Sequence, residues 1–205
     1  MTAAGAADLR YLDVPIEAVE LTPFGSRIQG MDLPFELKMW VADCGHGLEE
    51  AWRQCDRADW MVRLLVAANF DAKRVTLLAI TVAEDVLPLV QGSVAQLRNA
   101  MVCARDWCRG MTPLAQVQLA IRQAHMGNSQ TQTFPFYAVA SACHSCVHQG
   151  DAANAVYAAA EAQANFGDVQ RGESVNQAIA RHLARYADMV RAAVPASDLG
   201  QAMGL

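Results

Sequence analysis

Residues 93–110 have the sequence SVAQLRNAMVCARDWCRG, which decides the fold class of this 205-residue chain. Apolar side chains recur in it at intervals of three and four residues, the period of a helix with one buried face. The residues that follow this period are Val94, Leu97, Met101, Ala104 and Cys108. Ser93 offers a hydroxyl that can cap the first turn, and Gly110 can end the last turn. The stretch therefore predicts one amphipathic helix.

The same signals recur along most of the chain. Asp71 can cap another helix, and Thr112 followed by Pro113 is a typical helix start. Further helices are expected to begin at Pro135, Asp151 and Ser174. Short connections favour antiparallel packing of neighbouring helices. We therefore expect an all-α fold, an antiparallel bundle of about seven to eight helices that occupies residues 36–195.

The two ends of the chain depart from this pattern. Residues 1–35 are interrupted by prolines and glycines, which break any long helix; these are Pro15, Pro23, Gly25, Gly30 and Pro34. We expect this segment to form an extended, irregular arm that packs on the body or on a second subunit. Residues 196–205 follow a proline and are expected to form a flexible tail.

Acidic charge is concentrated near the start of the chain. Residues 1–60 hold 11 of the 21 acidic residues but only 5 of the 16 lysines and arginines. No basic run is present that can neutralise phosphates, so nucleic acid is not an expected partner. The acidic segment suits a basic protein partner, and the plainer alternative is a set of solvating charges on an exposed arm.

The sequence lacks the features of an exported or membrane-spanning protein. No apolar run approaches the roughly 18 residues that a bilayer span requires. The first ten residues lack a basic start followed by an apolar stretch, so no secretory signal is predicted. We expect a cytoplasmic protein whose six cysteines are mainly small buried thiols and not a disulfide framework.

Residues 143–148, CHSCVH, contain the residue types of a metal site. On a helix, Cys143 and Cys146 share one face, and His144 and His148 share another. These four side chains cannot easily close one tetrahedral site, so a metal would need ligands from a neighbouring helix. The candidates for that role are His125 and Cys103. Ordinary helix packing is the favoured interpretation, and we expect no cofactor.

Motifs of known catalytic sites are not found in the sequence. Residues 44–47, CGHG, place a cysteine near a histidine, but nucleophile pairs of this kind normally meet only in the fold. Adjacent acids at Glu49-Glu50 and Glu84-Asp85 point to different faces of a helix, so they cannot act as an acid–base pair. We therefore expect the protein not to be an enzyme.

Residues 48–61, LEEAWRQCDRADWM, resemble the opening of a helical bacterial family of immunity proteins, whose members carry an EAW–C–R–DW pattern. A helix that ends in LP is matched by residues 86–88, and an A–W–RG helix end is matched by residues 104–110. Alanine-rich helices follow, and residues 187–191, ADMVR, are similar to the closing segment. The resemblance covers most of the helical body but not residues 1–35 or the cysteine–histidine segment.

The resemblance implies a protein that binds and neutralises a cognate bacterial toxin. No binding residues transfer with it, so the acidity and aromatic content of the opening block decide where we expect a basic toxin to dock. The expected docking residues are Glu49, Glu50, Trp52, Asp56, Asp59 and Trp60. Tryptophans that anchor the core are the alternative interpretation of Trp52 and Trp60. Two other functions stay open: an assembly protein that forms homo-oligomers through its arm, and a metal-binding helical bundle.

Overall fold

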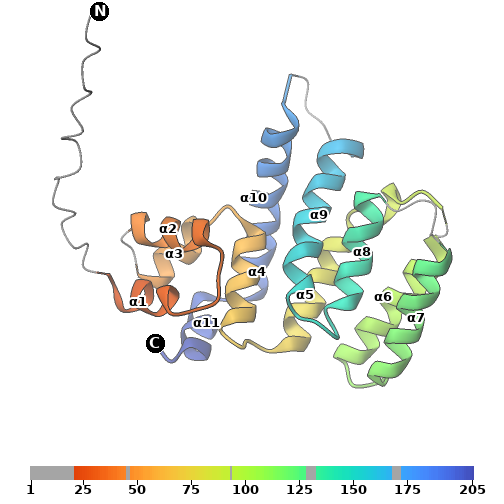
Figure 1. The fold of residues 1–205 in the computed structure, drawn as a ribbon, viewed down its shortest axis with the longest axis horizontal. Coiled ribbons are helices and arrows are strands. Elements are labelled where there is room, and N and C mark those ends of the chain that lie inside the picture. The colour runs from red at the N-terminus through yellow and green to blue at the C-terminus, as the bar shows by residue number, and fades with distance from the viewer. Residues whose placement is uncertain (1–20, 45–46, 93, 128–132, 168–171) are drawn as a thin grey trace, which may run out of the picture.

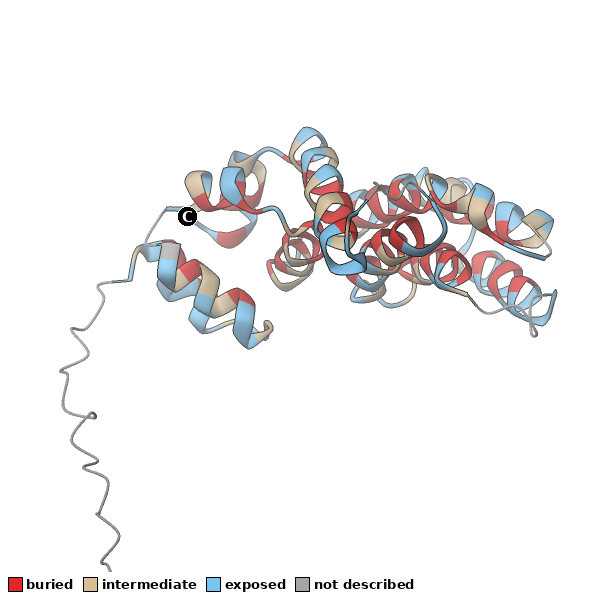
Figure 2. Cartoon of the chain, turned by 90° about the horizontal axis from the view of Figure 1, so that it is seen from above, coloured by how far each residue is buried: buried red, intermediate tan, exposed pale blue. Residues whose placement is uncertain are grey.

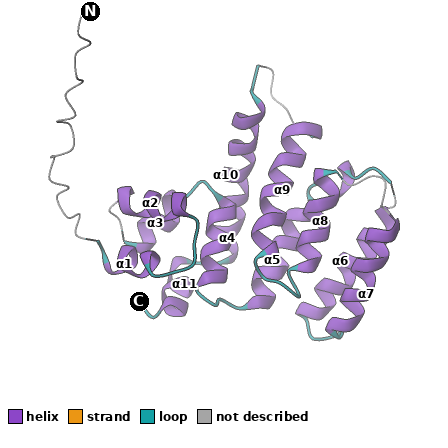
Figure 3. Cartoon of the chain, viewed as in Figure 1, coloured by secondary structure: helices purple, strands orange, loops and turns teal. Residues whose placement is uncertain are grey.

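The structure is a computed structural model that describes residues 21–44, 47–92, 94–127, 133–167 and 172–205. These residues form eleven α-helices and one short 3-10 helix, with no β-strand among them (Figure 3). None of their helices has both the length and the apolar character that crossing a bilayer requires. The prediction of an all-α fold is confirmed, whereas the predicted number of helices was too low. In chain order the elements are α1 (Pro23–Gln29), α2 (Phe35–Cys44), α3 (Leu48–Gln54), α4 (Ala58–Ala67), α5 (Ala72–Glu84), η1 (Leu87–Leu89), α6 (Val94–Cys108), α7 (Leu114–Gly127), α8 (Phe134–His144), α9 (Asp151–Phe166), α10 (Val175–Ala193) and α11 (Ala196–Met203).

The helices form an elongated array (Figure 1). At one end lie α1, α2, α3 and α11, and at the other end lie α6 and α7. The middle is occupied by α9, against which α4, α5, α8 and α10 all pack. Consecutive helices such as α6 and α7, or α8 and α9, run in opposite directions and pack side by side, because the loops between them are short.

Helix boundaries follow local signals in the sequence. The side chain of Asp71 accepts hydrogen bonds from two backbone amides in the first turn of α5. Ser174 and Gln177 form a capping box at the start of α10. After α6, Gly110 has a φ of +76°, a left-handed backbone that glycine adopts without steric cost. Ser93, the predicted cap of α6, lies outside the described residues.

Alanine allows the central helices to approach one another closely. Most alanines of α9 are buried, and they point to more than one neighbouring helix. A methyl side chain keeps two helix axes near the short end of the usual range of separations. Larger side chains fill the remaining space, with Phe136 and Tyr186 fully buried. The buried faces of the helices therefore turn inward along the whole array (Figure 2).

The prediction of an extended arm was wrong for the part of residues 1–35 that the structure describes. Pro23 begins α1, because proline is compatible with the first turn of a helix. The hydroxyl of Thr22 accepts a 3.1 Å hydrogen bond from the Gly25 amide and caps this helix. One face of α1 is buried through Phe24 and packs on α2. Residues 1–20 lie outside the described residues.

The prediction of a flexible tail was also wrong. Pro195 ends α10, as expected, but it is also the N-cap residue of α11. Leu199 and Met203 are buried on one side of α11, which packs against α3. Asp198 forms a 3.0 Å ion pair with Arg74 of α5. The C-terminal residues therefore close the core at this end of the molecule.

Candidate protein-binding surface

Only part of the predicted docking block lies at the surface. Trp52 is 5% exposed, and its indole nitrogen donates a 3.0 Å hydrogen bond to the carbonyl oxygen of Val194. Asp59 is 3% exposed. Both residues therefore contribute to the core, where no partner reaches them. Of the other predicted residues, Glu49 and Asp56 are exposed, and Glu50 and Trp60 are half-buried.

The buried carboxylate of Asp59 is neutralised by Arg57. The Arg57 Nε atom donates to Oδ1 of Asp59 at 2.9 Å, and Nη2 donates to Oδ2 at 2.7 Å. These hydrogen bonds, together with the charge of Asp59, raise the pKa of Arg57 and keep it a cation. Because two parallel hydrogen bonds fix the plane of a guanidinium, Arg57 is held in one orientation.

Arg57 lies among aromatic side chains that come from three helices. Its guanidinium carbon is 4.6 Å from the ring centre of Trp60 and 6.0 Å from that of Tyr157. The ring centres of Trp60 and Trp40 are 6.1 Å apart. We call Trp40, Arg57, Trp60 and Tyr157 the aromatic cluster. Tyr157 is exposed, and the other three are half-buried, so the cluster reaches the surface.

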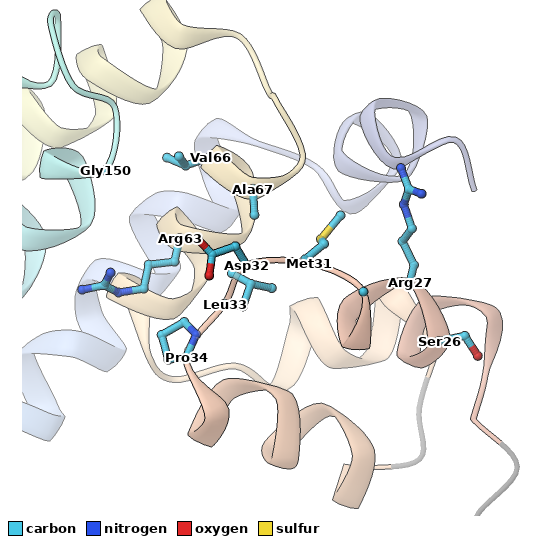
Figure 4. Close-up of a pocket in the computed structure, with 11 residues that line it drawn as sticks. Ser26, Arg27, Met31, Asp32, Leu33, Pro34, Arg63, Val66, Ala67 and Gly150 are labelled. Atoms are coloured by element: carbon cyan, nitrogen blue, oxygen red, sulfur yellow. The ribbon is translucent and has the colours of Figure 1, made fainter.

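An open cleft of about 620 Å³ lies beside α4 (Figure 4). One wall is the loop between α1 and α2, which includes Asp32, and the other wall is α4. Trp60, Arg63 and Ala67 share one face of α4, so this helix connects the cluster to the cleft. Arg63 is positioned by a 3.2 Å hydrogen bond to Asn154 of α9. The cleft combines apolar walls with charged groups of both signs.

The sequence revealed one member of this surface directly. Trp60 belongs to the predicted docking block, because it stands beside acidic residues. Trp40 and Tyr157 were missed, since α2 and α9 meet α4 only through the tertiary fold. The cleft was missed for the same reason. The signal in the sequence was limited to the aromatic residues themselves, which carry no information about their neighbours.

Residues 143–148 form the junction between α8 and α9. Cys143 and Cys146 are buried, and burial raises the pKa of Cys143 and that of Cys146, the latter to about 12. The Nδ1 atom of His144 is hydrogen-bonded to Oδ2 of Asp151 at 2.6 Å, and its ring centre is 5.1 Å from that of His148. Within the part of the chain that the structure describes, no three His, Cys, Asp or Glu side chains are arranged to hold a metal ion.

The remaining candidates for metal binding and catalysis are placed as follows. His125 lies on α7 with its ring edge-on to Phe136, 5.2 Å between centres, and Cys103 is buried on α6. Cys44 is the last residue of α2, whereas Gly45 and His46 lie outside the described residues. The neighbouring acids of α5 join helices: Glu84 pairs with Arg105 of α6, and Asp85 accepts hydrogen bonds from α9 and α10.

No protein-family model, no curated protein and no solved structure matches this chain. The likeness of residues 48–61 to the opening of immunity proteins therefore stays a prediction. The geometry of the aromatic cluster and the cleft is the basis on which a function can be assigned.

Proposed function

We propose that this protein is a binding module that recognises another protein through the aromatic cluster and the adjoining cleft. The observation that supports binding is the fixed guanidinium of Arg57 beside the rings of Trp60 and Tyr157. The proposed partner is a basic toxin, which this protein neutralises by direct contact. The identity of the partner rests on the resemblance to immunity proteins and on the acidic charge of residues 1–60.

The composition of the cluster is that of an energetic centre in a protein interface. Tryptophan, tyrosine and arginine are the residue types that most often dominate binding energy. Half-buried rings keep apolar area that a partner can still remove from water. Because Asp59 already orients Arg57, little side-chain freedom is lost when the cluster binds. A rigid aromatic surface of this kind favours tight binding over a small area.

Acidic side chains lie next to the cluster and in the cleft wall, where Arg27 and Arg63 are also present. Asp56 is exposed next to Arg57, and Asp32 forms part of the cleft wall. Glu49 is exposed on α3. Negative charge around an apolar centre accelerates encounter with a basic partner and disfavours acidic ones. The acidic charge of residues 1–60 therefore supports selection of a basic toxin, while the aromatic cluster supports affinity.

The test begins with the genes that flank the gene for this chain. Each neighbouring product is expressed alone and together with this protein, and growth of the cells is measured. For a product that stops growth, we expect protection by the wild-type chain and direct binding by calorimetry. Trp60→Ala and Tyr157→Ala should each weaken binding by about 2 kcal/mol, the usual threshold of a hot spot, and reduce protection.

Trp107→Ala is the matched control. Trp107 is also a half-buried tryptophan next to a cation, with the Lys73 ammonium 5.8 Å from its ring, but it lies on α6. We expect this variant to bind as the wild type does. Wild-type affinity in both cluster variants, or an equal loss in Trp107→Ala, would show that the partner binds elsewhere. Neighbouring products that are neither toxic nor bound would contradict the toxin assignment.

A further inference from the structure

The two ends of the elongated molecule carry opposite charge. At the end formed by α1, α2 and α3, residues 21–56 contain six acidic residues and three basic ones. At the other end, α6 and α7 lie within residues 94–127, which contain four arginines and one acidic residue. The ends therefore have formal charges of −3 and +3, and they are separated by the length of the array (Figure 1).

The acidic end exposes an apolar helix face. Phe35 is 72% exposed and Met39 is 41% exposed, one turn apart on α2. Glu36 and Asp43 are exposed on the same side, since these four positions fall within about 100° around the helix axis. The opposite side of α2 is buried through Leu37 and Val41. We call Phe35, Glu36, Met39 and Asp43 the acidic face.

The basic end exposes a matching face on α7. Leu119 is 50% exposed and Met126 is 79% exposed, two turns apart. Arg122 is exposed between them, and the three positions fall within about 60° around the axis. The other side of α7 packs on α6 and α8. We call Leu119, Arg122 and Met126 the basic face.

We propose that the acidic face of one molecule binds the basic face of a second copy, so that the molecules associate head to tail. Each face offers two large apolar side chains, and each carries charge of the sign that the other lacks. Two acidic faces brought together would place Glu36 and Asp43 against their own copies, and this like-charge contact is unfavourable. When two molecules bind through different faces, the pair still has one free acidic face and one free basic face. Association therefore continues into a chain or closes into a ring.

This self-association goes beyond the proposed recognition of a toxin and does not depend on it. The acidic and basic faces contain no member of the aromatic cluster. Arg57, Trp60 and Tyr157 lie outside both faces, whereas Trp40 is one turn from Glu36 and Asp43 on α2. The contact also differs from oligomerisation through an extended arm of residues 1–35, because both faces belong to helices, α2 and α7.

The experiment measures the mass of the full chain in solution by size-exclusion chromatography with light scattering. At low ionic strength the wild type should exceed the 22.2 kDa of one chain, and its mass should rise with concentration. Two variants each block one face: Glu36→Lys with Asp43→Lys on α2, and Arg122→Glu on α7. Each variant alone should stay monomeric, because its altered face repels the intact face of every other copy.

Mixing the two blocked variants is the decisive step. The intact basic face of the first variant can bind the intact acidic face of the second. The two altered faces also carry opposite charge, because α2 of the first variant gains lysines and α7 of the second gains a glutamate. The mixture should therefore regain a mass above that of one chain, with the two variants alternating, whereas each variant alone stays monomeric. Salt at about 1 M, where the Debye length is about 3 Å, should shift the wild type toward the monomer.

Matched controls change the charge of exposed positions away from both faces. Asn176→Lys and Ala180→Glu both lie at exposed positions of α10, which carries neither face. Both should associate as the wild type does, and helicity by circular dichroism should be unchanged in every variant. The proposal is wrong if the wild type is monomeric at every concentration, if a blocked variant still associates, or if the mixture of blocked variants stays monomeric.

Discussion

The phenol oxygen of Tyr186 donates a 2.9 Å hydrogen bond to Oδ2 of Asp85, which joins α10 to the C-terminal end of α5. The same carboxylate atom accepts a 3.1 Å hydrogen bond from Gln163 of α9 and pairs with Arg185. Helices α5, α9 and α10 therefore meet at one side chain. A hydrogen bond to a charged group contributes more to the free energy of folding than one between neutral groups. Loss of a hydrogen bond to Asp85 should therefore lower the stability of the fold measurably.

Tyr186→Phe should lower the free energy of unfolding by about 2 kcal/mol. The change removes the hydroxyl while keeping the ring, and Asp85 loses one of its donors in a partly buried site. Urea denaturation followed by circular dichroism measures the difference. The matched control is Tyr157→Phe, an exposed tyrosine, which should change stability by less than about 0.5 kcal/mol. Equal effects of the two substitutions would show that the Asp85 junction does not stabilise the fold.

The same tyrosine should make stability depend on alkaline pH. Burial, and the negative charge of Asp85, raise the pKa of Tyr186 above the value of about 10 that an exposed tyrosine has. The folded state therefore holds the phenol proton more tightly than the unfolded state does. This contribution is fully present below about pH 10 and is lost as the pH rises further. Urea denaturation measures the free energy of unfolding at each pH. Between about pH 8 and 11 this free energy should fall less in Tyr186→Phe than in the wild type.

Leu199→Ala should cost about 2 to 4 kcal/mol of stability, because it leaves a cavity beneath α11. Leu199 is fully buried in the segment for which the sequence predicted a flexible tail. Leu205→Ala is the control, since Leu205 is 52% exposed two residues after α11 ends. Thermal denaturation of both variants compares the two sites. A Leu199→Ala variant as stable as the control would mean that α11 does not dock in solution.

Buried thiols should be unreactive in the folded protein. Burial raises the pKa of Cys55 to about 11 and that of Cys146 to about 12, so little reactive thiolate is present near neutral pH. Alkylation at about pH 8 should therefore label Cys55, Cys143 and Cys146 only after denaturation. Peptide mass spectrometry of native and urea-treated samples measures each site. Rapid labelling of Cys143 in the native protein would show that the junction between α8 and α9 opens.

The sequence signals that were interpreted correctly act over a few residues. The hydroxyl of Ser174 and the carboxylate of Asp71 bind amides of the next turn, so their effect needs no distant partner. Gly110 ends a helix because of its own backbone freedom. Pro23 and Pro195 misled the interpretation, since proline both ends one helix and begins another. Whether a helix begins at a proline depends on whether the residues after it can pack their apolar side chains against the rest of the protein.

Helical periodicity and capping were enough to establish an all-α body, because they follow from interactions along one segment of chain. The tertiary structure alone decided which aromatic and acidic side chains are accessible. Trp52 and Asp59 looked like surface residues of an acidic block, yet packing against the end of α10 and pairing with Arg57 place them inside. Tyr157 reaches Arg57 across 100 residues of sequence. Burial is a property of several helices at once, so no short stretch of residues contains it.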